Sequence, residues 1–356
     1  MARSAGGFRS SPAGSDSRTR CAPDFRRAIR PRPLIVRYLV SPSPHCSFEI
    51  YMRTQSAISG VLIIDKAGGM TSHDVVQYFR RLFDTSKVGH LGTLDPMATG
   101  VLPLCIGKAT RVGQFFATSP KEYIGEIRFG FATTTYDREG TPTTPEVPFV
   151  SSREEVTSAM SELTGSLEQK PPAYSAKKVG GVRSHDSARR GEVVENAPIR
   201  VEVSVFEVTA FAPPSVQFRV VCGGGTYVRS LAHDLGQRLG CGAHLSSLRR
   251  LRSGDFGIEG AVRMESADVS NVTPLDELFV HWPSRVVSGL EERRVRQGNP
   301  IPSEEMTGLV RILNNQGQFL AVAAVESGWA RPRVVLTSGT SVEAGGASLH
   351  MAENGI

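Results

Sequence analysis

Apolar and polar positions fall into regular patterns from about Gly60 onward. Residues 61–65, Val-Leu-Ile-Ile-Asp, form a short apolar run of the kind that builds buried strands. Thr71 or Ser72 can then cap a helix. The apolar residues after this cap recur at helical spacing, which predicts one buried face: Val75, Val76, Phe79, Leu82 and Phe83. Residues 87–103 read as a glycine-rich loop.

The middle of the chain alternates between strand and helix patterns. We predict strands over 123–131, 198–211 and 215–222, the last of which alternates apolar and polar residues. Ser152-Arg-Glu-Glu155 is a capping box that opens a helix. A second helix should begin at a Thr226 cap and end at Gly240, with an apolar face of Val228, Leu231, Leu235 and Leu239. Residues 168–191 read as a basic loop.

The pattern changes at about residue 281 to short strands separated by turns. Examples are the apolar runs 308–313 and 319–325, with Asn-Asn-Gln-Gly between them at 314–317. The sequence therefore predicts an α+β catalytic domain over 58–280, built on a mixed sheet with helices. A small β-rich domain over 281–340 and a flexible tail over 341–356 should follow it.

Residues 1–57 differ in composition from the rest of the chain. They hold ten arginines, no lysine and three acidic residues, and they lack periodic apolar structure. We expect this segment to be disordered or non-native, and residues 1–51 to be dispensable. A translation start at Met52 is the favoured interpretation. A mitochondrial transit peptide and an RNA-binding arm remain as alternatives.

Charge and cysteine content limit the functional classes. The net charge is +6, but the arginine-rich tail supplies +7, so the remaining chain is near neutral. RNA binding by this remainder would need a local basic face. Candidate phosphate-contact clusters are Lys177-Lys178, Arg189-Arg190 and Arg249-Arg250-Arg252, with ordinary solvated surface as the alternative. Five scattered cysteines without a CxxC pair, and no long apolar run, predict a soluble cytoplasmic protein without a membrane span or metal site.

The loop at 87–103 carries the strongest chemical signal. Asp95 precedes a proline, which disfavours helical backbone at the aspartate, and Gly89, Gly92 and Gly100 permit turns around it. A carboxylate on such a loop is suited to act as a nucleophile or a base. An isolated Asp-Pro is more often a simple turn, so its surroundings must decide.

Those surroundings resemble one family. Residues Gly89-His-Leu-Gly-Thr-Leu-Asp-Pro-Met-Ala-Thr-Gly-Val-Leu-Pro103 resemble the signature of the TruB family of pseudouridine synthases, which modify uridine 55 in the TΨC arm of tRNA. Five further segments resemble that family in order and approximate spacing. They are Asp65-Lys66 with Gly69-Met-Thr-Ser-His-Asp-Val-Val76, Lys121-Glu-Tyr123, Gln169-Lys-Pro-Pro-Ala-Tyr-Ser-Ala-Lys177, Gly225-Thr-Tyr-Val-Arg-Ser230, and Leu239-Gly-Cys-Gly-Ala-His-Leu-Ser-Ser-Leu-Arg-Arg250.

The resemblance implies a role for each matched residue. Asp95 would be the nucleophile, Arg229 would pair with it, and Tyr123 would lie near the flipped uracil and transfer a proton. The resemblance places three residues at positions that contact the target nucleotide: His90, Tyr227 and Leu248. Lys66 would support the site structurally.

The resemblance also implies a pseudouridine synthase fold with a PUA-like C-terminal domain, and tRNA as the substrate through its TΨC stem-loop. Isomerising uridine requires no cofactor, and we infer no obligate protein partner. Attack by the carboxylate at C6 of the base or at C1′ of the ribose remains open. Two other functions remain: a subunit guided by a separate RNA, and a tRNA-binding folding chaperone.

Overall fold

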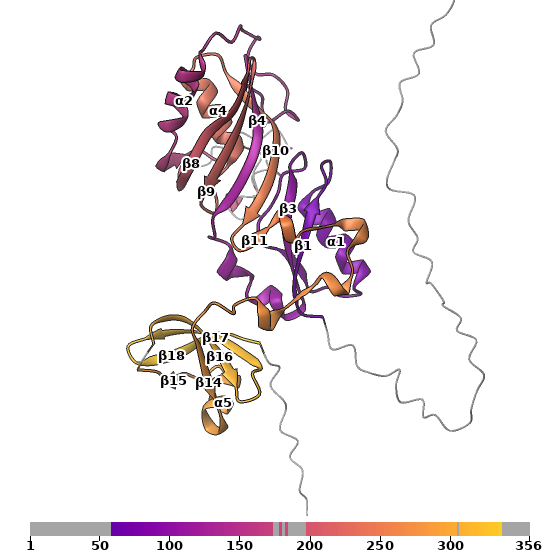
Figure 1. Ribbon diagram of the computed structural model, residues 1–356, viewed down its shortest axis with the longest axis vertical. Coiled ribbons are helices and arrows are strands. Elements are labelled where there is room, and N and C mark those ends of the chain that lie inside the picture. The colour runs from indigo at the N-terminus through magenta and orange to yellow at the C-terminus, as the bar shows by residue number, and fades with distance from the viewer. Residues whose placement is uncertain (1–57, 174–177, 180–181, 184–196, 305, 337–356) are drawn as a thin grey trace, which may run out of the picture. The chain divides into compact units, whose positions relative to one another are not determined.

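The computed structural model describes residues 58–173, 178–179, 182–183, 197–304 and 306–336 (Figure 1). The predictions for residues 1–57, for the tail at 341–356 and for the Arg189-Arg190 cluster lie outside these residues. Among the described residues, no helix is both long enough and apolar enough to cross a membrane.

A large mixed sheet forms the body of the protein. Its strands follow the order β12-β1-β3-β10-β4-β9-β8-β5. Their bounds are β1 Gly60–Lys66, β3 Thr99–Ile106, β4 Lys121–Phe129, β5 Gly165–Gln169, β8 Ile199–Ala212, β9 Ser215–Cys222, β10 Ala243–Ser253 and β12 Val262–Arg263. Strands β2 (Val88–His90), β11 (Phe256–Gly257) and β13 (Thr273–Pro274) pair with β3, β10 and β1. The central strand β10 runs parallel to β3 and antiparallel to β4, so it joins the two halves of the sheet.

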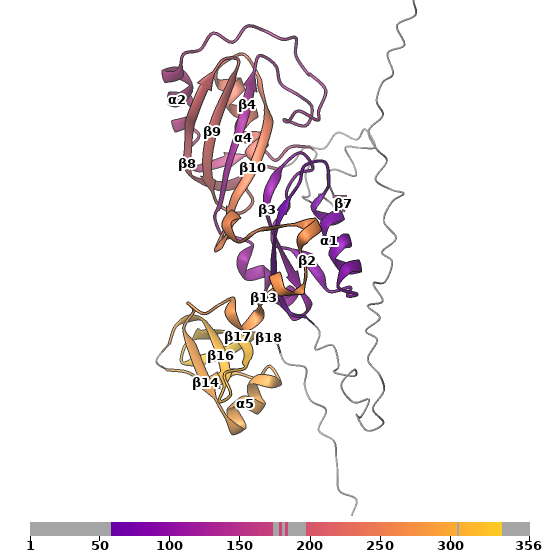
Figure 2. The same ribbon diagram turned by 45° about the vertical axis from the view of Figure 1, so that its right-hand side comes forward.

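Among the described residues, three helices pack on this sheet. Helix α1 (Ser72–Leu82) lies beside β2, α2 (Arg153–Ser161) packs on β8, and α4 (Val228–Arg238) packs on β10 and touches α2 (Figure 2). Thr71 and Ser152 both form capping boxes, so two free backbone N–H groups are satisfied at the start of each helix. These caps agree with the sequence prediction.

Short 3₁₀ helices and one small hairpin complete the body. The 3₁₀ helices are η2 Gly107–Arg111, η3 Gly113–Phe116, η4 Ile258–Gly260, η5 Met264–Ser266, η6 Val269–Asn271 and η7 Leu275–Glu277. Strands β6 (Lys178–Val179) and β7 (Val182–Arg183) pair as a hairpin.

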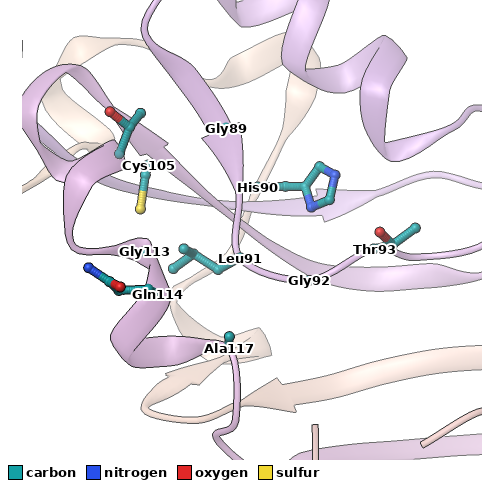
Figure 3. A pocket seen from close by; sticks show the side chains of 10 residues that line it. Gly89, His90, Leu91, Gly92, Thr93, Cys105, Gly113, Gln114 and Ala117 are labelled. Atoms are coloured by element: carbon teal, nitrogen blue, oxygen red, sulfur yellow. The ribbon is translucent and has the colours of Figure 1, made fainter. Parts of the chain in front are cut away.

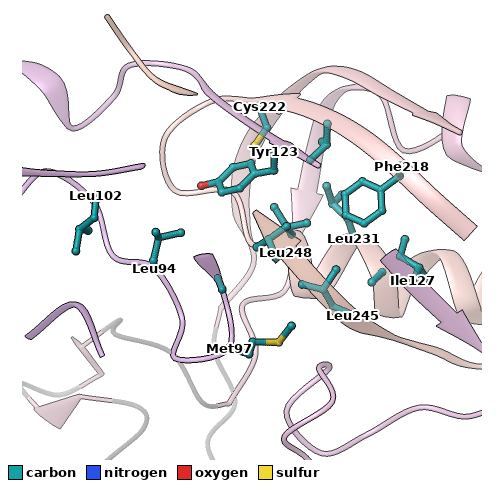
Figure 4. Close-up of a cluster of buried hydrophobic side chains, with 14 of the residues drawn as sticks. Leu94, Met97, Leu102, Tyr123, Ile127, Phe218, Cys222, Leu231, Leu245 and Leu248 are labelled. Carbon is teal, nitrogen blue, oxygen red and sulfur yellow. The ribbon is translucent and has the colours of Figure 1, made fainter. Parts of the chain in front are cut away.

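The alternating residues of β9 lie in the main core. Val216, Phe218 and Val220 are fully buried there, beside Ile127 of β4 and Leu231 of α4 (Figure 4). The side chains that alternate with them stay at the surface, because successive residues of a strand point to opposite faces. The period-two pattern therefore predicted the buried face of this strand correctly.

A separate five-stranded sheet follows, in the order β14-β16-β17-β18-β15. Its elements are β14 Ser284–Val287, α5 Gly289–Arg296, β15 Ile301–Pro302, β16 Gly308–Asn314, β17 Phe319–Glu326 and β18 Trp329–Val335. It has a hydrophobic cluster of its own, which includes Val310, Leu320 and Val325. The fold is therefore α+β with a small β-rich C-terminal sheet, as the sequence predicted, and it fits a PUA-like module. The exact domain limits, 58–280 and 281–340, stay a proposal.

Three local predictions were wrong. Residues 87–103 are not one loop, because β2 and the start of β3 occupy its ends. Helix α4 is capped by Tyr227 rather than Thr226, and no side chain bonds to its first turn as a cap. Leu82, the last residue of α1, is half exposed and does not belong to the buried face formed by Val75, Val76 and Phe79.

Candidate active site

The loop between β2 and β3 carries Asp95, and buried residues on both sides of Asp95 hold this loop in place. Leu94 and Met97 are nearly fully buried and anchor the loop in the core (Figure 4). The hydroxyl of Ser72, the first residue of α1, donates to the carbonyl of Leu94 at 3.0 Å and accepts from its N–H at 2.8 Å. Apolar packing and this reciprocal pair fix the backbone, so the Asp95 side chain, 30% exposed, is held at the surface of the core.

Lys66 secures the other side of this loop. Its ammonium group is buried and donates to three carbonyl oxygens, those of Ala67 at 2.9 Å, Met70 at 2.8 Å and Pro96 at 3.2 Å. Burial lowers the pKa of Lys66 from 10.5 to about 8, while the nearby Asp95 carboxylate acts in the opposite direction. These contacts place Lys66 beneath the loop, consistent with the supporting role implied by the resemblance.

Arg229, in the first turn of α4, lies against Asp95. Its Nη2 donates to Asp95 Oδ1 at 2.9 Å, and its Nε lies 2.8 Å from Oδ2. The planar guanidinium therefore faces both carboxylate oxygens, an arrangement that a lysine could not reproduce. The arginine side chain is only 7% exposed. The pair therefore fixes the position and orientation of the Asp95 carboxylate beside a positive charge.

Asp137 is a site residue that the sequence did not reveal. Its carboxylate is 4% exposed and lies 3.4 Å from Nη1 of Arg229, on the side away from Asp95's contacts. It also accepts from the Thr135 hydroxyl at 2.6 Å and from the Glu139 N–H at 3.0 Å. The Thr135 carbonyl accepts from the same Nη1 at 3.1 Å. Arg229 is thus held between two carboxylates, and within its own segment Asp137 reads only as a turn residue.

Tyr123 and Leu248 lie on adjacent strands beside this ion pair. Both are buried, on β4 and β10 respectively (Figure 4). Burial raises the pKa of Tyr123, and the neighbouring Arg250 guanidinium opposes that rise through its charge and a hydrogen bond. The phenol is therefore protonated at neutral pH and can act as a proton donor.

His90, five residues before Asp95, and Tyr227, two residues before Arg229, are both half-buried. Burial lowers the pKa of the His90 imidazole, and the positive charges of Arg250 and His73 add to this effect. His90 also lines a cavity of about 340 Å³, together with Thr93 and Gln114 (Figure 3). Asp95 does not line this cavity, so the ion pair rather than the cavity defines the candidate site.

The basic cluster at 249–252 does not offer three free cations to phosphate. Arg250 is 1% exposed, and its guanidinium donates to the carbonyls of Val101 at 2.7 Å, Gly92 at 3.1 Å and Thr93 at 3.4 Å. Both Nη atoms of Arg249 donate to the carboxylate of Asp65, and Arg252 forms an ion pair with Glu259. For Arg250 the phosphate interpretation is wrong, because its side chain is used inside the protein to hold the loop that precedes Asp95.

The groups gathered around Asp95 are those that covalent catalysis requires. Among the residues that the structure describes, no group of three or more His, Cys, Asp or Glu side chains could hold a metal ion. A fixed carboxylate, an arginine paired with it and a phenol nearby together can attack an electrophilic carbon and move a proton.

Two family models match the chain in succession. The model described as "TruB family pseudouridylate synthase (N terminal domain)" matches residues 80–228. The model described as "tRNA pseudouridylate synthase B C-terminal domain" matches residues 229–277. Together they span the segment that carries Asp95, Tyr123 and Arg229, and the five-stranded sheet lies beyond them.

Curated relatives match over nearly their whole length. tRNA pseudouridine synthase B of Solibacter usitatus is 42% identical over 281 residues, covering 75% of this chain and 96% of the relative. The protein of the same name from Thermobifida fusca is 44% identical over 286 residues, covering 78% and 98%. A chain from an H/ACA RNP bound to a substrate RNA containing 2′-deoxyuridine shares the fold, at 24% identity and a TM-score of 0.58, covering 78% of this chain and 85% of that one. The chain therefore belongs to the TruB family of pseudouridine synthases.

Proposed function

We propose that this protein is a tRNA pseudouridine synthase that converts uridine 55 in the TΨC arm to pseudouridine, with Asp95 as the nucleophile. The observation that carries the proposal is the buried Arg229 guanidinium, facing both oxygens of a carboxylate on a rigid loop. Relatives that carry the name tRNA pseudouridine synthase B, similar to this chain over 96–98% of their length, support the substrate.

The reaction rearranges one nucleotide without adding or removing atoms. The N1–C1′ bond breaks, the base turns, and a C5–C1′ bond forms. C5 then loses its proton and N1 gains one, so substrate and product are isomers. In this proposal the Asp95 carboxylate forms a transient covalent bond, at C6 of the base or at C1′ of the ribose, and leaves again once the base has turned. No external oxidant, reductant or group donor is required, so the proposal includes no cofactor.

The other site residues receive supporting roles in this proposal. Tyr123 would lie against the uracil and transfer the proton between carbon and nitrogen, and Leu248 would form the apolar floor beside it. His90 and Tyr227 would contact the target nucleotide. The base must leave its stack to reach Asp95, and the unstacking is less unfavourable for a nucleotide in a loop than in a duplex. Lys66 would support the loop from below.

The RNA is proposed to be the TΨC stem-loop, bound without a guide RNA or an obligate protein partner. The length over which the bacterial relatives match supports a stand-alone enzyme, whereas the likeness to the H/ACA chain concerns the fold alone. The C-terminal sheet would add phosphate contacts in the manner of a PUA-like module. Its strand β18 exposes Trp329 and Arg331 on one face, on either side of the buried Ala330, and Arg333 is exposed at an irregularity of the same strand.

The test compares wild type with Asp95→Asn on a tRNA transcript that carries tritium at C5 of uridine. Because C5 gives up its hydrogen during the reaction, tritium release reports turnover directly. Asp95→Asn should bind the stem-loop and release no tritium, since the amide keeps the shape but lacks nucleophilicity. Release by Asp95→Asn within about tenfold of wild type would refute the assignment of Asp95. Binding without turnover by both proteins would favour a chaperone.

A further inference from the structure

Gln169 is a buried amide at the edge of the large sheet that the reaction described above does not use. It is the last residue of β5, and its backbone is paired with Ile199 of β8. The residue is only 2% exposed. It begins the segment Gln-Lys-Pro-Pro, one of the segments that resemble the family, and no chemical role has yet been given to that segment.

The Gln169 carboxamide binds both backbone groups of Tyr227. The Tyr227 N–H donates to Oε1 at 2.8 Å, and Nε2 donates to the Tyr227 carbonyl at 3.1 Å. An amide side chain offers one donor and one acceptor in a single plane, so it can satisfy both groups of one residue at once. Asparagine would be too short to reach, and an ionised glutamate would lack the donor.

Tyr227 is the residue at which this contact affects the helix. It is the N-cap of α4, but its own side chain makes no capping hydrogen bond. Its carbonyl also accepts the first hydrogen bonds of the helix, from the N–H groups of Ser230 and Leu231. Three residues after Tyr227, the Ser230 hydroxyl donates to the carbonyl of Lys170, the residue that follows Gln169, at 2.8 Å. The first turn of α4 is therefore joined to the end of β5 by three hydrogen bonds.

That same turn carries Arg229, whose guanidinium must meet Asp95, Thr135 and Asp137 together. A rotation of the Tyr227 peptide would move the arginine and the tyrosine ring as one unit. We propose that Gln169 is a positioning residue of the reaction, which acts through the Tyr227 backbone to set Arg229 against Asp95. This inference rests on the proposed function, and it gives the Gln-Lys-Pro-Pro segment a role in catalysis.

The first test uses Gln169→Met, which keeps the volume and removes both hydrogen bonds. We expect the single-turnover rate of tritium release to fall about 10- to 100-fold, because a displacement near 1 Å in a reacting group has an effect of this size. RNA affinity should stay close to that of wild type. Ser152→Ala is the matched control, since it removes a capping hydrogen bond from α2, a helix that carries none of the site residues. A rate for Gln169→Met no lower than that of Ser152→Ala would overturn the proposal.

Gln169→Glu separates positioning from general loss of structure. A buried glutamate has a raised pKa, and its protonated form regains the donor that the Tyr227 carbonyl requires. The rate of Gln169→Glu relative to wild type should therefore rise as the pH falls from about 8 to about 5.5, while the relative rate of Gln169→Met stays flat. Parallel profiles for the two variants would contradict the hydrogen-bonding mechanism.

A readout independent of turnover distinguishes this inference from the proposed function. Hydrogen exchange in the first turn of α4, residues 227–231, should accelerate in Gln169→Met and not in Ser152→Ala. Unchanged exchange would overturn the positioning inference even in an active enzyme. If the wild type released no tritium but exchange were faster in Gln169→Met, the hydrogen bonds of Gln169 to the Tyr227 backbone would be supported. The proposed function alone would then be refuted.

Discussion

Asp137→Asn is the most informative single change at the site, because it alters the support of Arg229 without changing Asp95, the proposed nucleophile. The carboxylate lies 3.4 Å from Nη1 of Arg229. At that distance the attraction between unit charges is about 5 kcal/mol for an effective dielectric constant near 20. The amide also cannot serve every partner. Whichever way it is turned, its NH₂ group faces either the arginine or the Glu139 N–H, and both of these are donors.

The net loss of stability should be smaller than this attraction, because the variant no longer buries the charge of Asp137. We expect a loss of about 2–4 kcal/mol, at the lower end of what breaking a buried pair produces. This corresponds to a fall in Tm of roughly 5–12 °C. The single-turnover rate should drop about 10- to 100-fold, since Arg229 keeps Asp95 but loses its second anchor. RNA affinity should be nearly unchanged, because Asp137 is too buried to touch RNA.

Thermal unfolding and tritium release measure these two effects on the same preparations. Glu162→Gln is the matched control, since it also replaces a carboxylate that pairs with an arginine of α4, here Arg238, at 2.7 Å. Both of those side chains are well exposed, at 42% and 61%, so the control should lose less than about 1 kcal/mol. If Asp137→Asn matched Glu162→Gln in both stability and rate, the two-carboxylate support of Arg229 would be refuted.

Three further changes test other contacts. Lys66 has a pKa of about 8 in the folded protein and an ordinary value of 10.5, so the unfolded state binds more protons between these values and wild-type stability should rise with pH across that window. The free energy of unfolding, measured with denaturant, should show no such rise with pH in Lys66→Met. Parallel stability-against-pH curves for wild type and the variant would contradict the burial of the Lys66 charge. Arg250→Lys keeps the charge but cannot reach three carbonyls, so tritium release should slow, whereas a wild-type rate would exclude Arg250 from holding the loop. Arg331→Ala should lower RNA affinity and reduce the slope of log K against log salt by about 1, and an unchanged slope would exclude this arginine from phosphate contact.

Local pattern predicted the elements of this fold well. The alternation in β9 identified three of its four buried residues, and the capping box at Ser152 located the start of α2. Both signals are short-range, since a strand's period and a helix cap each depend on a few neighbouring residues. The start of α4 was placed one residue early because its first turn is stabilised by Gln169, which lies far away in the sequence, and not by its own threonine.

Sequence motifs predicted the central pair of the site but not the contacts that support it. Asp95 and Arg229 were matched because each lies in a distinctive segment, and the structure brings them together. Asp137, Gln169 and Arg250 act through partners that lie between 58 and 158 residues away, and their neighbours in sequence give no hint of those partners. Arg250 shows the difficulty most clearly. In sequence it belongs to a basic cluster, and only burial among backbone carbonyls reveals that it faces inward.

The most direct measurement of the central claim is the position of pseudouridine in an unmodified tRNA transcript after incubation with the purified protein. Chemical labelling of pseudouridine followed by primer extension locates the modified nucleotide. The proposed function predicts one new pseudouridine at position 55 with wild type and none with Asp95→Asn at equal RNA occupancy. Modification elsewhere with position 55 unmodified, or modification of position 55 by Asp95→Asn, would contradict it.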